Sequence, residues 1–249
     1  MTPWRIWGVP ALAAALFVLL WALDANRSVF LVLNGLGPAT SDGLWANVTV
    51  LGDTLVAFAL CLPLWRRRPQ ALWAFVFVAL LGTLWVDGLK PFIDEARPPA
   101  VLGDAVHVIG PSYKHDSFPS GHATAAFAIG GLYALGWGSR AMAVAAMVVA
   151  TLVAISRCVV GVHWPLDILA GALGGWLAAV AALAVAQQTR AFGARPAVQW
   201  AVALFLAFCA AWLVIGHAKS GYPQADLLQR AIGICCLSAA AARLRRASA

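Results

Sequence analysis

Charged side chains are scarce in this sequence of 249 residues. Asp, Glu, Lys and Arg make up 11% of the chain, whereas a soluble domain carries about 25%. Hydrophobic residues reach 62%, and the mean hydropathy is +0.83. So few charges cannot cover a protein of this length with a hydrated surface, which excludes a soluble globular domain, a disordered chain and a collagen-like chain. The composition therefore predicts an integral membrane protein.

Cysteine is also sparse, and its spacing shows no pattern typical of a metal site. The chain holds five cysteines, and Cys61, Cys209, Cys235 and Cys236 lie inside apolar runs, where thiols act as small packing groups. They predict neither a metal site nor a redox compartment. The net charge of +7 could suggest nucleic acid, but the basic residues cluster between apolar runs, which indicates membrane topology. We expect no nucleic-acid partner.

Long hydrophobic runs, in contrast, recur along the chain. A spanning helix needs about 20 mostly apolar residues, and runs near that length fall at 5–23, 48–65, 71–89, 122–138, 141–157, 166–186, 198–215 and 228–242. The run at 28–36 is too short to span and is expected at the interface. The sequence predicts an all-α, polytopic transmembrane bundle with a six-helix catalytic core and about eight spans. It is expected to form a single domain over 1–249, with extra C-terminal helices at 198–242.

Acidic residues are missing from one set of connecting segments. With the N-terminus inside, the inner segments carry ten basic residues and no acid: Arg5, Arg66, Arg67, Arg68, Arg140, Arg190, Arg195, Arg243, Arg245 and Arg246. All ten acidic residues then lie at outer ends of spans or in outer loops. Because Lys and Arg accumulate in short cytoplasmic loops, both termini are predicted to be cytoplasmic.

Three polar segments on the outer side carry the residues suited to catalysis. They are residues 90–98, 118–122 and 156–167, so the catalytic motifs are expected within 90–167. Their cations are Lys90, Arg97 and Arg157, which can surround an anion, and each arginine can bond two phosphate oxygens in one plane.

The middle segment is typical of a helix start that binds an anion. Ser120 occupies an N-cap position, and the amides of Gly121 and His122 would point out of the helix toward phosphate oxygens. Gly121 also lets the backbone approach a ligand closely, because it has no side chain.

The spacing of His163 and Asp167 predicts a catalytic pair. With Pro165 in the first turn of a helix, Asp167 can hold one ring nitrogen of His163 and raise the basicity of the other. His163 is then the candidate nucleophile, and His122 is the candidate general acid. Each motif alone could also be purely structural. Lys90 and Arg97 could be snorkelling cations, residues 119–122 a plain helix start, and His163 with Asp167 a capping pair. Their shared position on one membrane face favours chemistry.

The order and spacing of these residues resemble a known family. Lys-x6-Arg-Pro at 90–98, Pro-Ser-Gly-His at 119–122 and Ser-Arg-x5-His-x3-Asp at 156–167 match the three-part signature of the type 2 phosphatidic acid phosphatase superfamily. The resemblance implies a membrane lipid phosphatase, similar to undecaprenyl-diphosphate and phosphatidylglycerophosphate phosphatases, that needs no metal and no other cofactor. It implies that His163 attacks phosphorus to form a phosphohistidine, His122 protonates the leaving group and Asp167 supports the nucleophile. The resemblance assigns phosphate binding to Lys90, Arg97, Ser120, Gly121 and Arg157.

Other polar residues lie in and beside the loop at 99–117. The acids there are irregularly spaced, so solvated or cation-pairing roles are expected rather than a divalent-cation site: Asp94, Glu95, Asp104 and Asp116. His107, Lys114 and His115 either line the substrate entrance or belong to a plain surface.

The predicted reaction is hydrolysis of a lipid phosphate or diphosphate at the periplasmic face of a cell inner membrane. Undecaprenyl diphosphate, cleaved to undecaprenyl phosphate, is the first candidate, because its diphosphate is left outside after glycan transfer. The alternatives are phosphatidylglycerophosphate, phosphatidic acid, a lipid A phosphate, or transfer of phosphate from lipid to lipid. A lipid transporter is disfavoured, since it has no need for paired His163 and Asp167. The expected partners are the lipid substrate and the bilayer, with no obligate protein partner.

Overall fold

The computed structural model describes residues 3–136, 139–216 and 220–248, and within these ranges every regular element is a helix. The first half contains α1 (Pro3–Ala22), α2 (Asn26–Asn34), α3 (Leu36–Ala39), α4 (Asp42–Thr49), η1 (Val50–Gly52), α5 (Thr54–Ala59), η2 (Leu62–Leu64), α6 (Pro69–Ile93), α7 (Pro98–Leu102) and η3 (Gly103–Ala105). The second half contains α8 (Gly121–Gly136), α9 (Arg140–Val159), α10 (Pro165–Gln188), α11 (Arg190–Gly193), α12 (Pro196–Ile215), η4 (Pro223–Ala225) and α13 (Asp226–Ser248). The expected all-α class is confirmed.

Six helical segments of the described chain are long and apolar enough to cross a membrane. They are α1, the segment 69–105 that starts with α6, α9, α10, α12, and the segment 223–245 formed by η4 and α13. A bent pair formed by 42–52 and 54–64 would make a seventh. Helix α8 has 16 residues, and positions 137 and 138 of the expected 122–138 span lie outside the described residues. The multi-span fold is confirmed, whereas the count of eight spans stays a prediction.

The expected span at 48–65 is not one straight helix. Its two halves meet at an angle of 59°. Asp53 has extended backbone angles and its side chain accepts a hydrogen bond from the amide of Leu55, so it ends η1 and caps α5. A residue that caps a new helix cannot also continue the preceding one, which explains the break.

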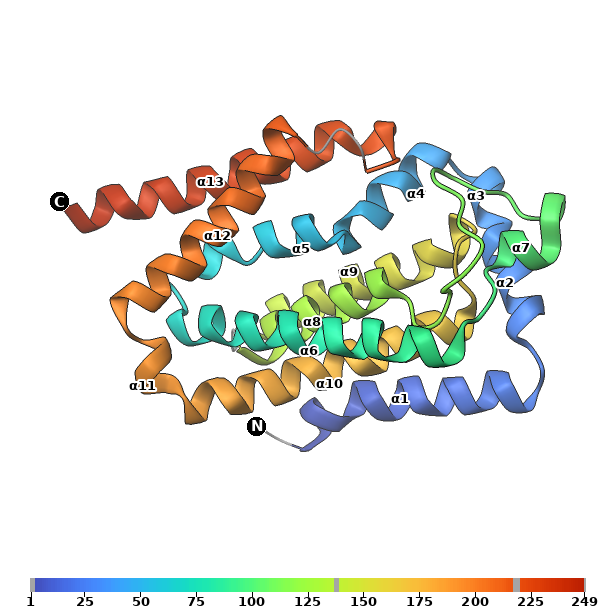
Figure 1. The fold of residues 1–249 in the computed structure, drawn as a ribbon, viewed down its shortest axis with the longest axis horizontal. Helices are drawn as coiled ribbons and strands as arrows, with labels where there is room; N and C mark the ends of the chain where they lie inside the picture. Colours follow the sequence, from blue (N-terminus) through green and yellow to red (C-terminus); the bar gives the residue numbers. More distant parts are fainter. Residues whose placement is uncertain (1–2, 137–138, 217–219, 249) are drawn as a thin grey trace.

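The long helices run side by side along the length of the molecule (Figure 1). Helices α6, α8, α9 and α10 form the centre, α1 lies along α10, and α12 with α13 covers the side next to α5. Glycine allows close contact between the backbones of α8 and α10: a Cβ atom at Gly175 of α10 would lie 2.3 Å from the Thr124 carbonyl oxygen of α8. Gly171 and Gly175 therefore let the two helix backbones touch, as small residues four apart do in membrane bundles.

The three polar segments gather at one end of this bundle, at the right of Figure 1, together with α2, α3 and α7. Both chain ends point toward the opposite end. Asn34, the buried last residue of α2, holds segments of this end together. Its side-chain amide donates to the carbonyl oxygens of His107 (2.8 Å) and Val159 (3.0 Å), and its oxygen accepts from the His107 amide. The short helix expected at the interface thus ties the outer loop to the end of α9.

Candidate active site

His163 and Asp167 form the pair that their spacing predicts. His163 Nδ1 lies 3.3 Å from Asp167 Oδ2, and both side chains are buried. The pair forms because α10 begins at Pro165, which places Asp167 in the first turn of the helix, facing back toward the preceding loop. A carboxylate accepts only, so the shared proton lies on Nδ1 and the lone pair of the ring lies on Nε2. This is the tautomer that a nucleophilic histidine requires.

The same carboxylate oxygen is held by two further donors. The Trp164 amide donates to Asp167 Oδ2 at 2.8 Å, and the Ser117 hydroxyl donates to it at 2.5 Å. Ser117 is fully buried although it lies in the long loop, fifty positions from Asp167 in the chain. The sequence motifs do not include Ser117, and a lone serine in a loop carries no signal that could have indicated this contact.

Arg97 binds both the outer loop and the histidine. Its guanidinium donates to the carbonyl oxygens of His115 (2.7 Å), Asp116 (3.0 Å) and Val162 (3.0 Å). One nitrogen, Nη1, lies 3.2 Å from Nε2 of His163. Arg97 reaches this position because Asp94 adopts a left-handed backbone conformation, with φ 37°, that ends α6 and turns the chain.

The environment of His163 favours its neutral form. Burial lowers the pKa of His163 well below its ordinary value, and the positive charges of Arg97, Arg157 and Lys90 lower it further. An imidazole in this setting keeps its Nε2 lone pair at neutral pH. The same cations that would bind phosphate therefore also keep the candidate nucleophile deprotonated.

Helix α8 begins as the sequence predicts. Ser120 is fully buried and its hydroxyl accepts from the Ala123 amide at 3.4 Å, while its own amide donates to the Asp167 carbonyl oxygen. This backbone contact places the start of α8 against the start of α10. His122 follows on the first turn, and the groups that act on it electrostatically include Arg157, His163, Arg97 and Lys90. The two histidines thus share one cationic environment.

Arg157 is buried near the end of α9, and Lys90 lies half-buried in the last turns of α6. Arg157 holds the loop before α10 in place, because its carbonyl oxygen accepts from the amides of Val162 and His163. Every residue that the sequence analysis placed in the site therefore comes from the same end of the bundle.

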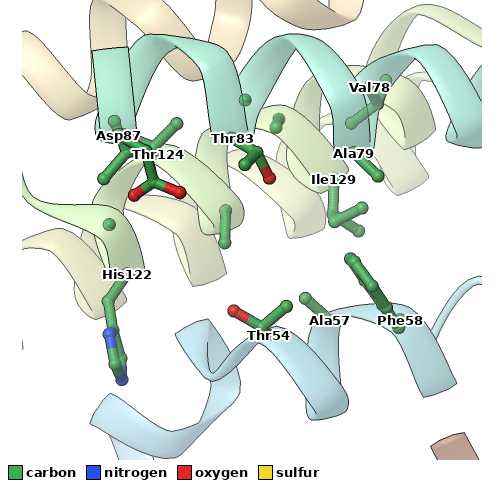
Figure 2. A pocket seen from close by; sticks show the side chains of 15 residues that line it. Thr54, Ala57, Phe58, Val78, Ala79, Thr83, Asp87, His122, Thr124 and Ile129 are labelled. Carbon is green, nitrogen blue, oxygen red and sulfur yellow. The ribbon is translucent and has the colours of Figure 1, made fainter. Parts of the chain in front are cut away.

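A cleft of about 210 Å³ leads away from the start of α8 between α5, α6 and α8. Its walls are mostly apolar, Gly121 is among the residues that line it, and His122 lies at one end (Figure 2). Figure 2 also shows three polar side chains directed into the cleft, Asp87 and Thr83 from α6 and Thr54 from α5. All three are exposed. The cleft connects His122, the candidate general acid, with the apolar part of the bundle.

The side chains of the remaining polar residues of the outer loop do not contact His163 or Asp167 in the part of the chain that the structure describes. His107 Nε2 contacts Asp42 Oδ1 at 2.8 Å, whereas Lys114, His115 and Asp116 have exposed side chains. The loop at 99–117 also contains the short helices α7 and η3. Within the described ranges, no three His, Cys, Asp or Glu side chains are arranged to hold a metal ion.

Comparison with known proteins decides the family. The sequence pattern of the PAP2 superfamily matches residues 70–191, which include all three polar segments. A protein of Escherichia coli strain K12 named putative undecaprenyl-diphosphatase YbjG is 40% identical over 167 residues, which cover 64% of this chain and 81% of the relative. The chain belongs to the PAP2 superfamily. The family resemblance of the motifs is thereby confirmed, and the chain is a membrane protein of the lipid phosphatase type.

Two further PAP2 relatives carry other names. The lipid A 1-phosphatase of Rhizobium etli is 34% identical over 132 residues, covering 49% of this chain and 56% of the relative. The crystal structure of Aquifex aeolicus LpxE superposes with a TM-score of 0.59 and 30% identity, covering 64% of this chain and 94% of that chain. The PAP2 match ends at residue 191, so helices α12 and α13 lie outside it.

Proposed function

We propose that this protein hydrolyses a lipid phosphate or diphosphate through a phosphohistidine on His163. The observation that carries the proposal is the state of the His163 ring. Asp167 holds Nδ1, the lone pair of the ring lies on Nε2 with Arg97 Nη1 3.2 Å away, and the cations around it suit a phosphate. A transition state with charge spread over phosphate oxygens is stabilised by such a preorganised set of donors.

The reaction has two steps. Nε2 of His163 forms a bond to phosphorus as the bond from phosphorus to the lipid oxygen, or to the bridging oxygen of a diphosphate, breaks. The negative charge of the bound phosphate offsets the surrounding cations and favours the protonated form of His122, which gives its proton to the departing oxygen. A water molecule then attacks the phosphohistidine, His122 accepts a proton from it, and inorganic phosphate leaves. Asp167 stabilises the imidazolium character of the ring in both steps.

We assign phosphate binding to the residues that the motifs contain. Arg97 and Arg157 supply planar donors, Lys90 supplies a point charge, and the start of α8 at Ser120 and Gly121 supplies amides and the positive end of the helix dipole. With this many positive groups around the phosphate, the protein needs no divalent cation to neutralise it. We accordingly propose a metal-independent reaction in one catalytic domain spanning 1–249.

The first substrate we propose is undecaprenyl diphosphate, hydrolysed to undecaprenyl phosphate. The cleft that His122 lines has mostly apolar walls, which offer a path for a lipid chain. The relative named putative undecaprenyl-diphosphatase supports this assignment. The distribution of basic residues supports a site that opens to the periplasmic side of an inner membrane.

One observation favours a second candidate, a lipid A phosphate. The cleft is polar next to the catalytic end, with Asp87, Thr83 and Thr54 directed into it. A carboxylate binds hydroxyl and amide donors, which a phosphorylated amino sugar offers and a polyprenyl chain lacks. The relatives with lipid A 1-phosphatase names are consistent with that chemistry.

Phosphate release from a panel of purified lipids in detergent tests the proposal. The panel contains undecaprenyl diphosphate, lipid A, phosphatidylglycerophosphate and phosphatidic acid, each with and without EDTA. We expect release in the presence of EDTA, with the highest kcat/KM for undecaprenyl diphosphate. A tenfold preference for lipid A would replace the first candidate by the second. Release that requires an acceptor lipid would indicate a transferase, and no turnover of any lipid would reject the enzymatic proposal.

A further inference from the structure

Arg157 is bonded on one side only. Its Nη1 donates to the Thr49 hydroxyl at 2.5 Å and lies 3.3 Å from the Tyr222 hydroxyl. Its Nε, in contrast, is buried and has no hydrogen-bond partner in the part of the chain that the structure describes. All three side chains are buried, with exposed fractions of 3% for Arg157, 0% for Thr49 and 5% for Tyr222.

The one-sided bonding leaves the Nε–Nη2 edge of the guanidinium available for a ligand. The N–H bonds of Nε and Nη2 point in parallel from one edge, and this edge forms the fork that binds two oxygens of a phosphate. Thr49 and Tyr222 bond the nitrogen at the opposite edge. They fix the plane and direction of the fork without occupying it, and an unpaired buried Nε is costly unless a ligand accepts from it.

Tyr222 is itself held firmly by neighbours of different segments. Its ring belongs to an apolar cluster with Trp45, Ile109, Val159, Val160 and Ala225. The outer loop packs tightly on the ring, since a Cβ atom at Gly110 would lie 2.5 Å from its Cε1 atom. A side chain with a fixed ring places its hydroxyl accurately.

We propose that Thr49 and Tyr222 are positioning residues that hold Arg157 with its Nε–Nη2 fork directed at the phosphate. The proposal rests on the role of Arg157 in the proposed function. Neither residue lies in the three motifs or in residues 70–191 that match the family: Thr49 ends α4, and Tyr222 lies between α12 and α13. The connection between α12 and α13 is therefore part of the phosphate site, because it carries one of the two groups that orient Arg157.

The test measures how tightly orthovanadate, a mimic of the phosphoryl group in transfer, binds to purified full-length variants in detergent. Vanadate affinity is obtained from inhibition of phosphate release and, independently of turnover, from the rise in Tm that vanadate causes. Tyr222→Phe and Thr49→Val each remove one hydroxyl while keeping most of the packing. We expect each to weaken vanadate binding and lower kcat/KM by about tenfold, because each removes a hydrogen bond to a charged group. Thr49→Ser, which keeps the hydroxyl, should restore both values.

A matched control separates positioning from folding. Tyr133→Phe likewise removes one hydroxyl, which donates to the backbone oxygen of Leu60. Tyr133 lies near the end of α8, away from the candidate active site at the start of that helix. This substitution should lower Tm without changing vanadate affinity. If Tyr222→Phe fails to fold, the comparison of Thr49→Val with Thr49→Ser is sufficient to test the proposal.

A double-mutant cycle gives the decisive comparison. In an Arg157→Ala background, Tyr222→Phe and Thr49→Val should change vanadate affinity by less than about twofold, because a positioning residue acts only through the group it positions. A loss as large as in the wild-type background would overturn the positioning role. So would unchanged vanadate affinity in both single variants when Arg157→Ala weakens it. Unchanged affinity in Arg157→Ala itself would instead refute the phosphate-binding role of Arg157 in the proposed function, and this inference with it.

Discussion

At the scale of single residues, one carboxylate oxygen organises the candidate nucleophile. Asp167 Oδ2 accepts from the Ser117 hydroxyl and the Trp164 amide as well as from His163. Two fixed donors hold the carboxylate still, and the carboxylate in turn fixes the plane and tautomer of the ring. The position of His163 Nε2 therefore depends on a serine from a different segment of the chain.

Removing that serine hydroxyl tests this dependence. We expect Ser117→Ala to lower kcat by about tenfold with little change in KM, because a hydrogen bond to a charged group is lost while the phosphate-binding residues remain. Ser139→Ala is the control, since Ser139 caps α9 at the opposite end of the bundle. Equal kcat in Ser117→Ala and the wild type would show that Asp167 is held without it.

The pH dependence tests the electrostatic account of His163. Attack requires neutral Nε2, so kcat/KM should fall as the pH drops through the pKa of His163, which burial and three cations place below the ordinary value of 6.5. Arg97→Gln should move this acid limb to higher pH, because removing a cation favours the imidazolium, and Arg97→Lys should not. An acid limb at or above pH 6.5 in the wild type would contradict the account.

The sequence could predict those residues whose partners are close in the chain. His163 and Asp167 are four positions apart, and the start of α10 at Pro165 places Asp167 in the first turn, where it faces back toward His163 in the preceding loop. Ser117, Thr49 and Tyr222 could not be predicted in this way. Their contacts join segments 50 to 108 positions apart, and their residue types are ordinary in loops and helices.

At the scale of elements, the contact between α8 and α10 brings together the helix of His122 and the helix that follows His163, the two candidate catalytic histidines. Gly171 and Gly175 lie against α8, and a Cβ atom at Gly171 would lie 2.7 Å from the Ser120 carbonyl oxygen. The helix that carries His122 and the helix that follows His163 are thus as close as two backbones can be. Hydropathy located both helices, but it could not show that Gly171 and Gly175 of α10 face α8.

We expect Gly175→Ala to separate these helices. The added methyl group would meet the Thr124 backbone, and overpacking of this kind costs about 1–3 kcal/mol. Activity should fall more steeply than stability, since a displacement of about 1 Å between reacting groups can cost about a hundredfold in rate. Gly88→Ala in α6 is the matched control, because a Cβ atom there has nothing within 4 Å. Identical Tm and kcat in the two variants would contradict the close-contact account.

Element boundaries were less predictable than the elements themselves. Apolar runs predicted the position of each long helix, because a spanning helix is recognised by its length and composition. The break within 42–64 depends on Asp53, whose side chain caps α5, and a single polar residue in an apolar run does not distinguish a cap from a tolerated acid.

At the scale of the whole molecule, the polar segments lie at one end and the basic, acid-free segments at the other. Labelling of single cysteines in intact cells tests which end faces out. After replacement of the exposed Cys235 by serine, Asp104→Cys should react with a thiol reagent that cannot cross the membrane, and Arg67→Cys should react only after lysis. The reverse pattern would place the site in the cytoplasm and exclude a periplasmic substrate.

The most direct test of the mechanism is to trap the phosphorylated enzyme. Purified protein is mixed with the lipid from the panel that it hydrolyses fastest, labelled with ³²P in the phosphate, and quenched within milliseconds in alkali, where phosphohistidine survives. We expect label on the peptide that contains His163, its loss on a chase with unlabelled lipid, and neither label nor turnover in His163→Ala. Continued turnover in His163→Ala, or label on a different residue in the wild type, would contradict the account.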